Sequence, residues 1–347
     1  MKMNSESDSI DNNDICDSTI DLAYTPEFKN LLNDINSIVL PKFYVWDNKS
    51  LTYQRYRQNI MLLMIFTGLI IIVVMIPDIN KLLPEKGGII IQNVIAFLVF
   101  VLLLIGIKYN FQKNWLLYRH KSELLRLLKF HTLLDPMTLS LNNEIPLKKL
   151  KQTIDEIDQI DQNTIDEFVK DEFDFWEYDR IILNQFERKN FLDLITYYRD
   201  RRIKSQIDYF EKRATSREKI DRYTKYLPKI TNFSGVFLLS LYFILGIFSY
   251  EDISKKLSFL VVIAAILPVL GSSIKSYRTT NEISRIASIY RTRQNKLSTI
   301  YNNLLYGLKQ ENIDINKEFE LMYECERILK EEHQEWLRLM IQSEWIT

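Results

Sequence analysis

The fold of this chain is decided by two apolar stretches, IMLLMIFTGLIIIVVMI at residues 60–76 and IIIQNVIAFLVFVLLLIGI at residues 89–107, which contain no charged side chain. The same holds for ITNFSGVFLLSLYFILGIF at residues 230–248 and LSFLVVIAAILPVLGSSI at residues 257–274. Each is close to the about 20 residues that a helix needs to cross a bilayer. A buried helix of a soluble protein usually keeps a polar stripe, whereas these are apolar all round. The pattern predicts four membrane-spanning helices.

All charged residues lie outside these four stretches. The 347-residue chain has 45 basic and 45 acidic residues, so its formal net charge is zero. A nucleic-acid-binding protein normally carries a basic excess, so we expect no nucleic-acid partner. The mean hydropathy of −0.13 resembles that of a soluble protein because the charges of the remaining chain offset the apolar stretches.

Basic residues flank the outer ends of both pairs of predicted spans. Arg57 and Lys108 enclose the first pair, and Lys225 and Lys275 enclose the second. Because basic flanks stay on the cytoplasmic side, both pairs are predicted to be hairpins with their tight turns outside. The N- and C-termini of this multi-pass protein would then lie in the cytoplasm. The two hairpins would contact the lipid bilayer.

The two hairpins repeat along the chain with an offset of about 170 residues, which is typical of a tandem duplication. We predict an all-α membrane protein in which long cytosolic helices form a bundle below two transmembrane hairpins. Its predicted segments are an acidic, largely disordered leader at residues 1–40, a first two-span unit at 41–145, an acidic helical arm at 146–187 and a second two-span unit at 188–347.

The sequence offers little catalytic chemistry. His120, His131 and His333 have no cysteine or carboxylate at metal-ligand spacing, and no phosphate-binding glycine loop or hydrolase motif is present. We therefore expect no enzyme activity, no metal and no cofactor. Cys16 and Cys325 would both lie in the reducing cytosol, so we expect no structural disulfide between them.

Two predicted cytosolic helices combine polar and apolar ridges. Arg202, Gln206 and Tyr209 fall on one helical face shortly before the third span. In the C-terminal helix, Glu332 lies inside an apolar stripe, where a carboxylate is costly unless it is paired. We expect Glu332 to pair with Arg202 or Arg285. The alternative is that both segments only pack the bundle.

These segments carry a resemblance to a known family. The second half of the chain resembles the SLATT family, the two-transmembrane effector domains associated with nucleotide-sensing conflict systems. The residues that carry this resemblance are Arg202, Gln206, Tyr209, Glu282, Tyr290, Glu326, Glu332 and Trp336. The first half looks like a more diverged copy, and the residues that carry this second resemblance are Trp115, Arg119, Glu123 and Arg126.

The resemblance implies a membrane effector that forms pores or channels in bacterial antiphage and abortive-infection systems. It also implies the bacterial inner membrane as the location of the chain. Family members are often encoded beside nucleotide second-messenger synthases or sensors. The expected trigger is therefore a nucleotide second messenger, or a separate sensor or synthase protein.

A water path through a membrane needs polar or small side chains on one side of the helices. The candidates are Thr67, Gln92, Asn93, Asn232, Ser234, Ser240, Ser272 and Ser273. They could instead only join neighbouring helices. Pro268 and Gly271 are candidates for a kink that acts as a gate.

One chain supplies only four predicted spans, which are too few to enclose a wide pore. We therefore expect a homo-oligomer. The alternative function is a non-conducting membrane anchor, whose cytosolic helical bundle senses or recruits a partner.

Overall fold

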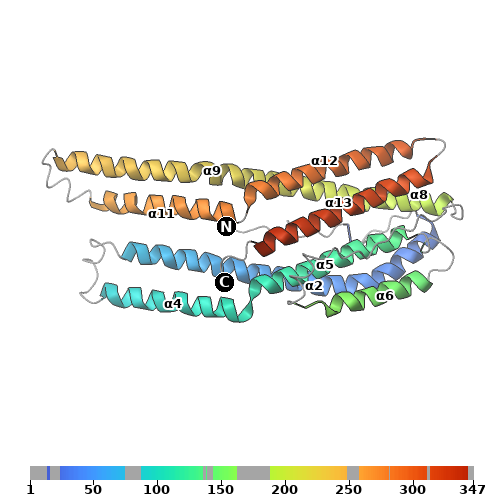
Figure 1. Ribbon diagram of the computed structural model, residues 1–347, viewed down its shortest axis with the longest axis horizontal. Coiled ribbons are helices and arrows are strands. Elements are labelled where there is room, and N and C mark those ends of the chain that lie inside the picture. The colour runs from blue at the N-terminus through green and yellow to red at the C-terminus, as the bar shows by residue number, and fades with distance from the viewer. Residues whose placement is uncertain are drawn as a thin grey trace. The chain divides into compact units, whose positions relative to one another are not determined.

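The computed structural model describes residues 14–15, 24–74, 87–135, 138, 144–161, 188–247, 258–280, 282–310 and 313–342. Over these residues the chain is helical and has no strand, which confirms the predicted all-α class (Figure 1). The helices are α2 (Pro26–Val74), α4 (Gly87–Tyr109), α5 (Phe111–Leu134), α6 (Glu144–Gln159), α8 (Arg188–Tyr197), α9 (Lys204–Ile247), α11 (Ser258–Thr280), α12 (Ile283–Gly307) and α13 (Ile315–Gln342), with a π-helical turn, η1 (Tyr198–Ile203), between α8 and α9.

The chain divides into two compact units. Unit 1 consists of Met1–Thr52, Lys113–Thr215 and Ile286–Gln342. Unit 2 consists of Tyr53–Gln112, Ser216–Arg285 and Ser343–Thr347. The boundary between Thr52 and Tyr53 falls inside α2, and the boundary between Thr215 and Ser216 falls inside α9. These two helices therefore each contribute residues to both units.

Two of the predicted segments differ from the structure or lie partly outside it. α2 begins at Pro26, inside the segment 1–40 that the sequence predicts as a leader, and Asp14 in the same segment is only 1% exposed. Residues 1–13 and 16–23 lie outside the described residues, as do residues 162–187 of the predicted acidic arm. The part of that arm that is described is α6.

The core of unit 1 consists of aliphatic and aromatic side chains from several helices. Phe130 and Leu133 of α5 are fully buried. Helix α5 runs antiparallel to α13, because its Trp115 ring contacts Trp336 near one end while the Tyr323 hydroxyl donates to the Leu134 carbonyl near the other, at 3.0 Å. This antiparallel pair positions the charged residues described below.

Unit 2 contains helices that expose large apolar side chains. Phe97 of α4 is 67% exposed, and Phe233 and Phe243 of α9 are 75% and 68% exposed. Apolar surface of this extent marks a binding or membrane surface. Among the described residues, three helical stretches are long and apolar enough to cross a membrane, namely Ile89–Leu134, Lys189–Ile244 and Leu260–Gly307.

The uncharged parts of these three stretches correspond to the second, third and fourth predicted spans, at 89–107, 230–248 and 257–274. The first predicted span, 60–76, lies in α2 as far as Val74. That span stays a prediction, and so does the total of four.

Close packing joins α9 to α11 within unit 2. A Cβ atom placed on Gly235 of α9 would lie 3.0 Å from the backbone oxygen of Ala264 and 3.0 Å from Cδ of Pro268, both on α11. A Cβ atom on Gly271 would lie 2.5 Å from the Thr231 hydroxyl oxygen. Small residues at such a contact let two membrane helices approach closely. The two gate candidates, Pro268 and Gly271, therefore lie at a helix–helix contact. Helix α11 is continuous through Pro268.

Candidate functional site

Buried charged side chains gather around the π-helical turn η1 of unit 1. A π-helical turn inside an α-helix holds one additional residue and often marks a functional site. Here it contributes Tyr198 and Arg202, which are 0% and 1% exposed. The sequence predicts an ordinary α-helix at this point, because neither composition nor hydrophobic periodicity reveals a π-helical turn.

The Arg202 guanidinium forms a bidentate pair with Glu326 of α13. Its Nε donates to Oε1 at 2.9 Å and its Nη2 donates to Oε2 at 2.8 Å. The Tyr198 hydroxyl also donates to Glu326 Oε1, at 2.7 Å, and the guanidinium lies 4.4 Å from the centre of the Phe130 ring. Burial alone would lower the pKa of Arg202, but the Glu326 carboxylate raises it well above its usual value. Arg202 is therefore held in place and charged.

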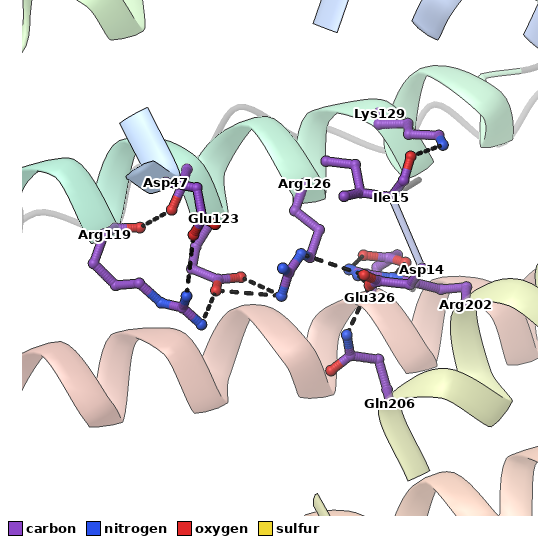
Figure 2. Close-up of polar contacts among 11 residues, drawn as sticks. Asp14, Ile15, Asp47, Arg119, Glu123, Arg126, Lys129, Arg202, Gln206 and Glu326 are labelled. Carbon is purple, nitrogen blue, oxygen red and sulfur yellow. Dashed lines mark hydrogen bonds and ion pairs between the residues drawn. The ribbon is translucent and has the colours of Figure 1, made fainter. Parts of the chain in front are cut away.

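Asp14 binds the remaining terminal nitrogen, Nη1, of the same guanidinium (Figure 2). Its Oδ2 accepts from Arg202 Nη1 at 2.6 Å and from Gln206 Nε2 at 2.7 Å. Its Oδ1 lies 3.5 Å from Nε of Arg126 on α5. Three side chains from η1, α9 and α5 thus converge on a single buried carboxylate.

The network continues along α5 through Glu123. The Glu123 carboxylate lies 2.5 Å from Arg119 Nη2 and 3.3 Å from Arg126 Nη1, and Asp47 of α2 lies 3.6 Å from Arg119 (Figure 2). Burial would raise the pKa of Glu123, but Arg119 and then Arg126 outweigh it and hold the pKa at about 2. Glu123 is therefore ionised at neutral pH.

Residues that the sequence singles out in both halves of the chain meet in this network. The first half contributes three of them and the second half contributes three, all within unit 1. They are Arg119, Glu123, Arg126, Arg202, Gln206 and Glu326. The sequence does not predict that they meet, and nothing in it distinguishes Asp14 from Asp8, Asp11 and Asp17, which share its spacing of three residues in a leader predicted to be solvated.

The expected partners of Glu332 are wrong. The Arg202 guanidinium binds Glu326 in place of Glu332, and Arg285 pairs with Glu282 of its own segment at 3.5 Å. The error has a physical cause: Glu326 and Glu332 lie six residues, or about 1.7 helical turns, apart on α13, and the sequence does not fix which carboxylate faces η1.

The surroundings of Glu332 favour its neutral form. Burial, and after it the nearby Glu123 carboxylate, raise the pKa of Glu332 to about 8 against the opposing effect of Arg119 and Arg293. Glu332 is therefore mostly protonated at neutral pH. A neutral acid at this position avoids a second negative charge beside Glu123.

We predict that Glu332→Gln stabilises the chain at pH 8. The folded-state pKa of about 8 lies above the usual value of 4.5, so this group's stabilising contribution is fully present below pH 4.5 and is lost as the pH rises through 8. Glutamine keeps the neutral form at every pH. The expected gain at pH 8 is about 1–2 kcal/mol, measured by thermal unfolding in detergent, with no gain near pH 4.5.

The control for this prediction is Glu331→Gln, which changes the preceding, exposed residue of the same helix. Its effect is expected to stay within about 0.5 kcal/mol at both pH values. An equal gain from both variants would contradict the assignment of the effect to Glu332.

A buried histidine pair lies between α5 and α13. His120 Nδ1 is 2.8 Å from His333 Nε2, and the two rings stack with centres 5.1 Å apart. Trp336 stacks on His333 and meets Trp115 edge to face. Burial lowers the pKa of His120 well below its usual value and that of His333 to about 4. Both imidazoles are therefore neutral at pH 7.

The described residues contain no group of three or more histidine, cysteine or acidic side chains placed to hold a metal ion. His131, the third histidine, is remote from the stacked pair, and burial lowers its pKa to about 3. Cys325 is buried as a free thiol, with a pKa that burial raises to about 12. Cys16 lies outside the described residues.

The remaining motif residues do not join the ionic network. Tyr209 lies edge to face with Tyr290, at 6.3 Å between ring centres, and Phe210 also contacts the Tyr290 ring. Glu282 has a φ of 45° between α11 and α12, where it belongs to unit 2. These residues shape the helix packing and the turn.

The polar candidates in the apolar helices fall into two groups. The hydroxyls of Thr67, Ser240 and Ser273 donate to backbone carbonyls four residues earlier in their own helices, at 3.0, 2.9 and 2.9 Å. Such bonds satisfy a hydroxyl without a partner helix. The second group consists of Asn93, Asn232 and Ser272, which are exposed, and Ser234, which is half-buried. The side chain of Gln92 lies outside the described residues.

Comparison with known families gives one match. Residues 198–336 match the model of SMODS and SLOG-associating 2TM effector domain 1. The match begins at the first residue of η1 and ends at Trp336, so it includes Arg202, Gln206 and Glu326 of the network. Neither the curated proteins nor the solved structures contain a match to this chain.

Proposed function

We propose that this chain is a membrane effector that forms a gated pore, because residues 198–336 match the model of the SMODS and SLOG-associating two-transmembrane effector domains, the SLATT family. Its place would be the bacterial inner membrane, with both termini in the cytoplasm. Its role would be antiphage defence by abortive infection, and a nucleotide signal or a partner protein would trigger it.

The observation that carries this proposal is the contrast between the two units. Unit 2 exposes phenylalanine side chains along helices of membrane-spanning length, while unit 1 buries arginine–carboxylate pairs. An effector needs both a part that acts on the membrane and a part that responds to a signal. The matched family is described as an effector domain with two transmembrane segments, which agrees with the first of these parts.

Helix α9 contains residues of the buried ionic network and residues of the apolar helix contact. It is continuous from Lys204 to Ile247 and carries both Gln206 of the ionic network and Gly235 of the apolar helix contact. A rearrangement around Gln206 would therefore be transmitted along one helix. The pore itself would need several copies of the chain, because few apolar helices are available in one copy.

Conduction can be tested by recording the purified full chain in planar bilayers. We expect discrete current steps, and we expect Asn93→Leu to change their conductance because Asn93 is an exposed polar side chain of α4. Ser240→Ala is the matched control, since the Ser240 hydroxyl already bonds to its own helix. Currents no larger than those of lipid alone, with a partner recovered by pull-down, would instead support the non-conducting membrane anchor.

A further inference from the structure

The donors that hold Asp14 are themselves held by other carboxylates. Glu326 binds two nitrogens of Arg202, and Glu123 binds Arg126. Arg202 Nη1, the nitrogen that binds Asp14, is a third position on the same rigid guanidinium. Because Glu326 and Glu123 fix the two arginines, their remaining donors stay in place whether or not Asp14 is bound.

Asp14 differs from the other members of the network in the way it reaches the site. Arg126, Arg202 and Glu326 belong to helices or to η1, whereas Asp14 lies in a turn ahead of α2. The following residue, Ile15, is 0% exposed, and its carbonyl accepts from Lys129 Nζ at 2.9 Å. The carboxylate is thus brought to the donors by the turn at residues 14–15, which is separate from the helices that make the site.

We propose that Arg126, Arg202 and Gln206 form an anion-binding site whose resident occupant is the chain's own Asp14, and that a phosphate group is the free ligand that can take its place. The proposal concerns unit 1 alone and adds a binding site to the proposed function. Exchange of Asp14 for a free anion would release the N-terminal segment from the bundle.

The donor set explains why the ligand should be a phosphate. Arginine presents planar, divergent N–H groups that match phosphate oxygens, and the Gln206 amide adds a neutral donor beside Arg202. Asp14 brings one negative charge, and a replacement must bring at least one, because a buried arginine without an anion is costly. The phosphate could be a free ion or part of a nucleotide, and the probes used in the experiment below distinguish these two sources.

Thermal unfolding of the full chain in detergent tests this site. In Asp14→Ala the site is vacated, so inorganic phosphate is expected to raise the melting temperature by about 3–6 °C at saturation. Wild-type protein should show a smaller rise at the same phosphate concentration, because phosphate must first displace Asp14 from the donors. Potassium chloride at equal ionic strength separates binding from charge screening.

The matched control is Asp193→Asn. Asp193 holds the N-terminal segment at another point, where its Oδ2 accepts from the backbone nitrogen of Thr25 at 2.8 Å and from the Thr25 hydroxyl at 2.7 Å. This variant loosens the segment without removing the Asp14 carboxylate, so it should not gain phosphate-dependent stability. AMP replaces inorganic phosphate in a second series, and a larger rise with AMP would identify a nucleotide as the source.

Two results would overturn the site. One is an Asp14→Ala protein that phosphate stabilises no more than chloride does, and the other is an equal rise in wild type. If Asp14→Ala does not fold, Asp14→Asn keeps the shape and an acceptor oxygen, and the same comparison applies to it. Phosphate-dependent unfolding tests the anion-binding site, and bilayer currents test the proposed pore. A negative result in one measurement therefore does not affect the interpretation of the other.

Discussion

Glu326→Ala is expected to destabilise unit 1 by about 3–5 kcal/mol, because it leaves the guanidinium of Arg202 buried without its bidentate partner. The Arg202 side chain is 1% exposed, so water cannot replace the lost carboxylate. The Tyr198 hydroxyl loses its 2.7 Å acceptor in the same variant. Chemical or thermal unfolding of the full chain in detergent measures this loss.

The double variant Arg202→Met/Glu326→Leu distinguishes a buried pair from a general loss of packing. Replacing both charges with apolar side chains removes the unpaired ion, so the double variant should be less destabilised than Glu326→Ala alone. Arg327→Ala is the surface control: the side chains of Arg327 and its partner Glu324 are 64% and 40% exposed, and the cost of the substitution should be about 0–1 kcal/mol. A double variant as unstable as the sum of its single variants would contradict the pairing.

Gly235→Val is expected to separate α9 from α11. The valine Cβ would lie 3.0 Å from the backbone oxygen of Ala264 and from Pro268, and its two methyl groups need further space. Because the backbone of α11 cannot rotate away as a side chain can, the helices must move apart. We expect a loss of about 1–3 kcal/mol in thermal stability in detergent.

Gly106→Val and Gly68→Val provide matched controls for this prediction. Both glycines lie in apolar helices, and a Cβ atom on either meets no other atom within 4 Å. Their valine variants should unfold within a few degrees of wild type. Equal destabilisation by all three substitutions would show that helix propensity, and not the contact with α11, determines the result. If the proposed pore exists, Gly235→Val should also alter its currents.

The positions of the apolar helices could be predicted from the sequence with good accuracy. The uncharged stretch 89–107 lies within α4, which runs from Gly87 to Tyr109, because a lack of charge over about 20 residues is a local property. The apolar stripe of α13 is also found, since Ile328 and Leu339 are buried as their spacing indicates.

The pairing of helices could not be predicted in the same way. His120 and His333 lie 213 residues apart and meet only because α5 and α13 are antiparallel neighbours. Asp14 joins Arg202 across 188 residues, from a segment whose acidic composition favours solvent exposure. Contacts of this kind depend on tertiary structure, which hydrophobic periodicity does not encode. Each motif residue can be recognised in the sequence by itself, but only the fold brings these residues together at one site.

The additional residue of η1 has a consequence for the rotational phase of everything that follows it. An α-helix turns about 100° per residue, so a single inserted position rotates the downstream side chains by roughly that angle relative to α8. Regular α-helical geometry over the same residues Tyr198–Ile203 would turn Gln206 away from Asp14. A helical wheel drawn straight through residues 188–247 therefore assigns inner and outer faces correctly on only one side of η1.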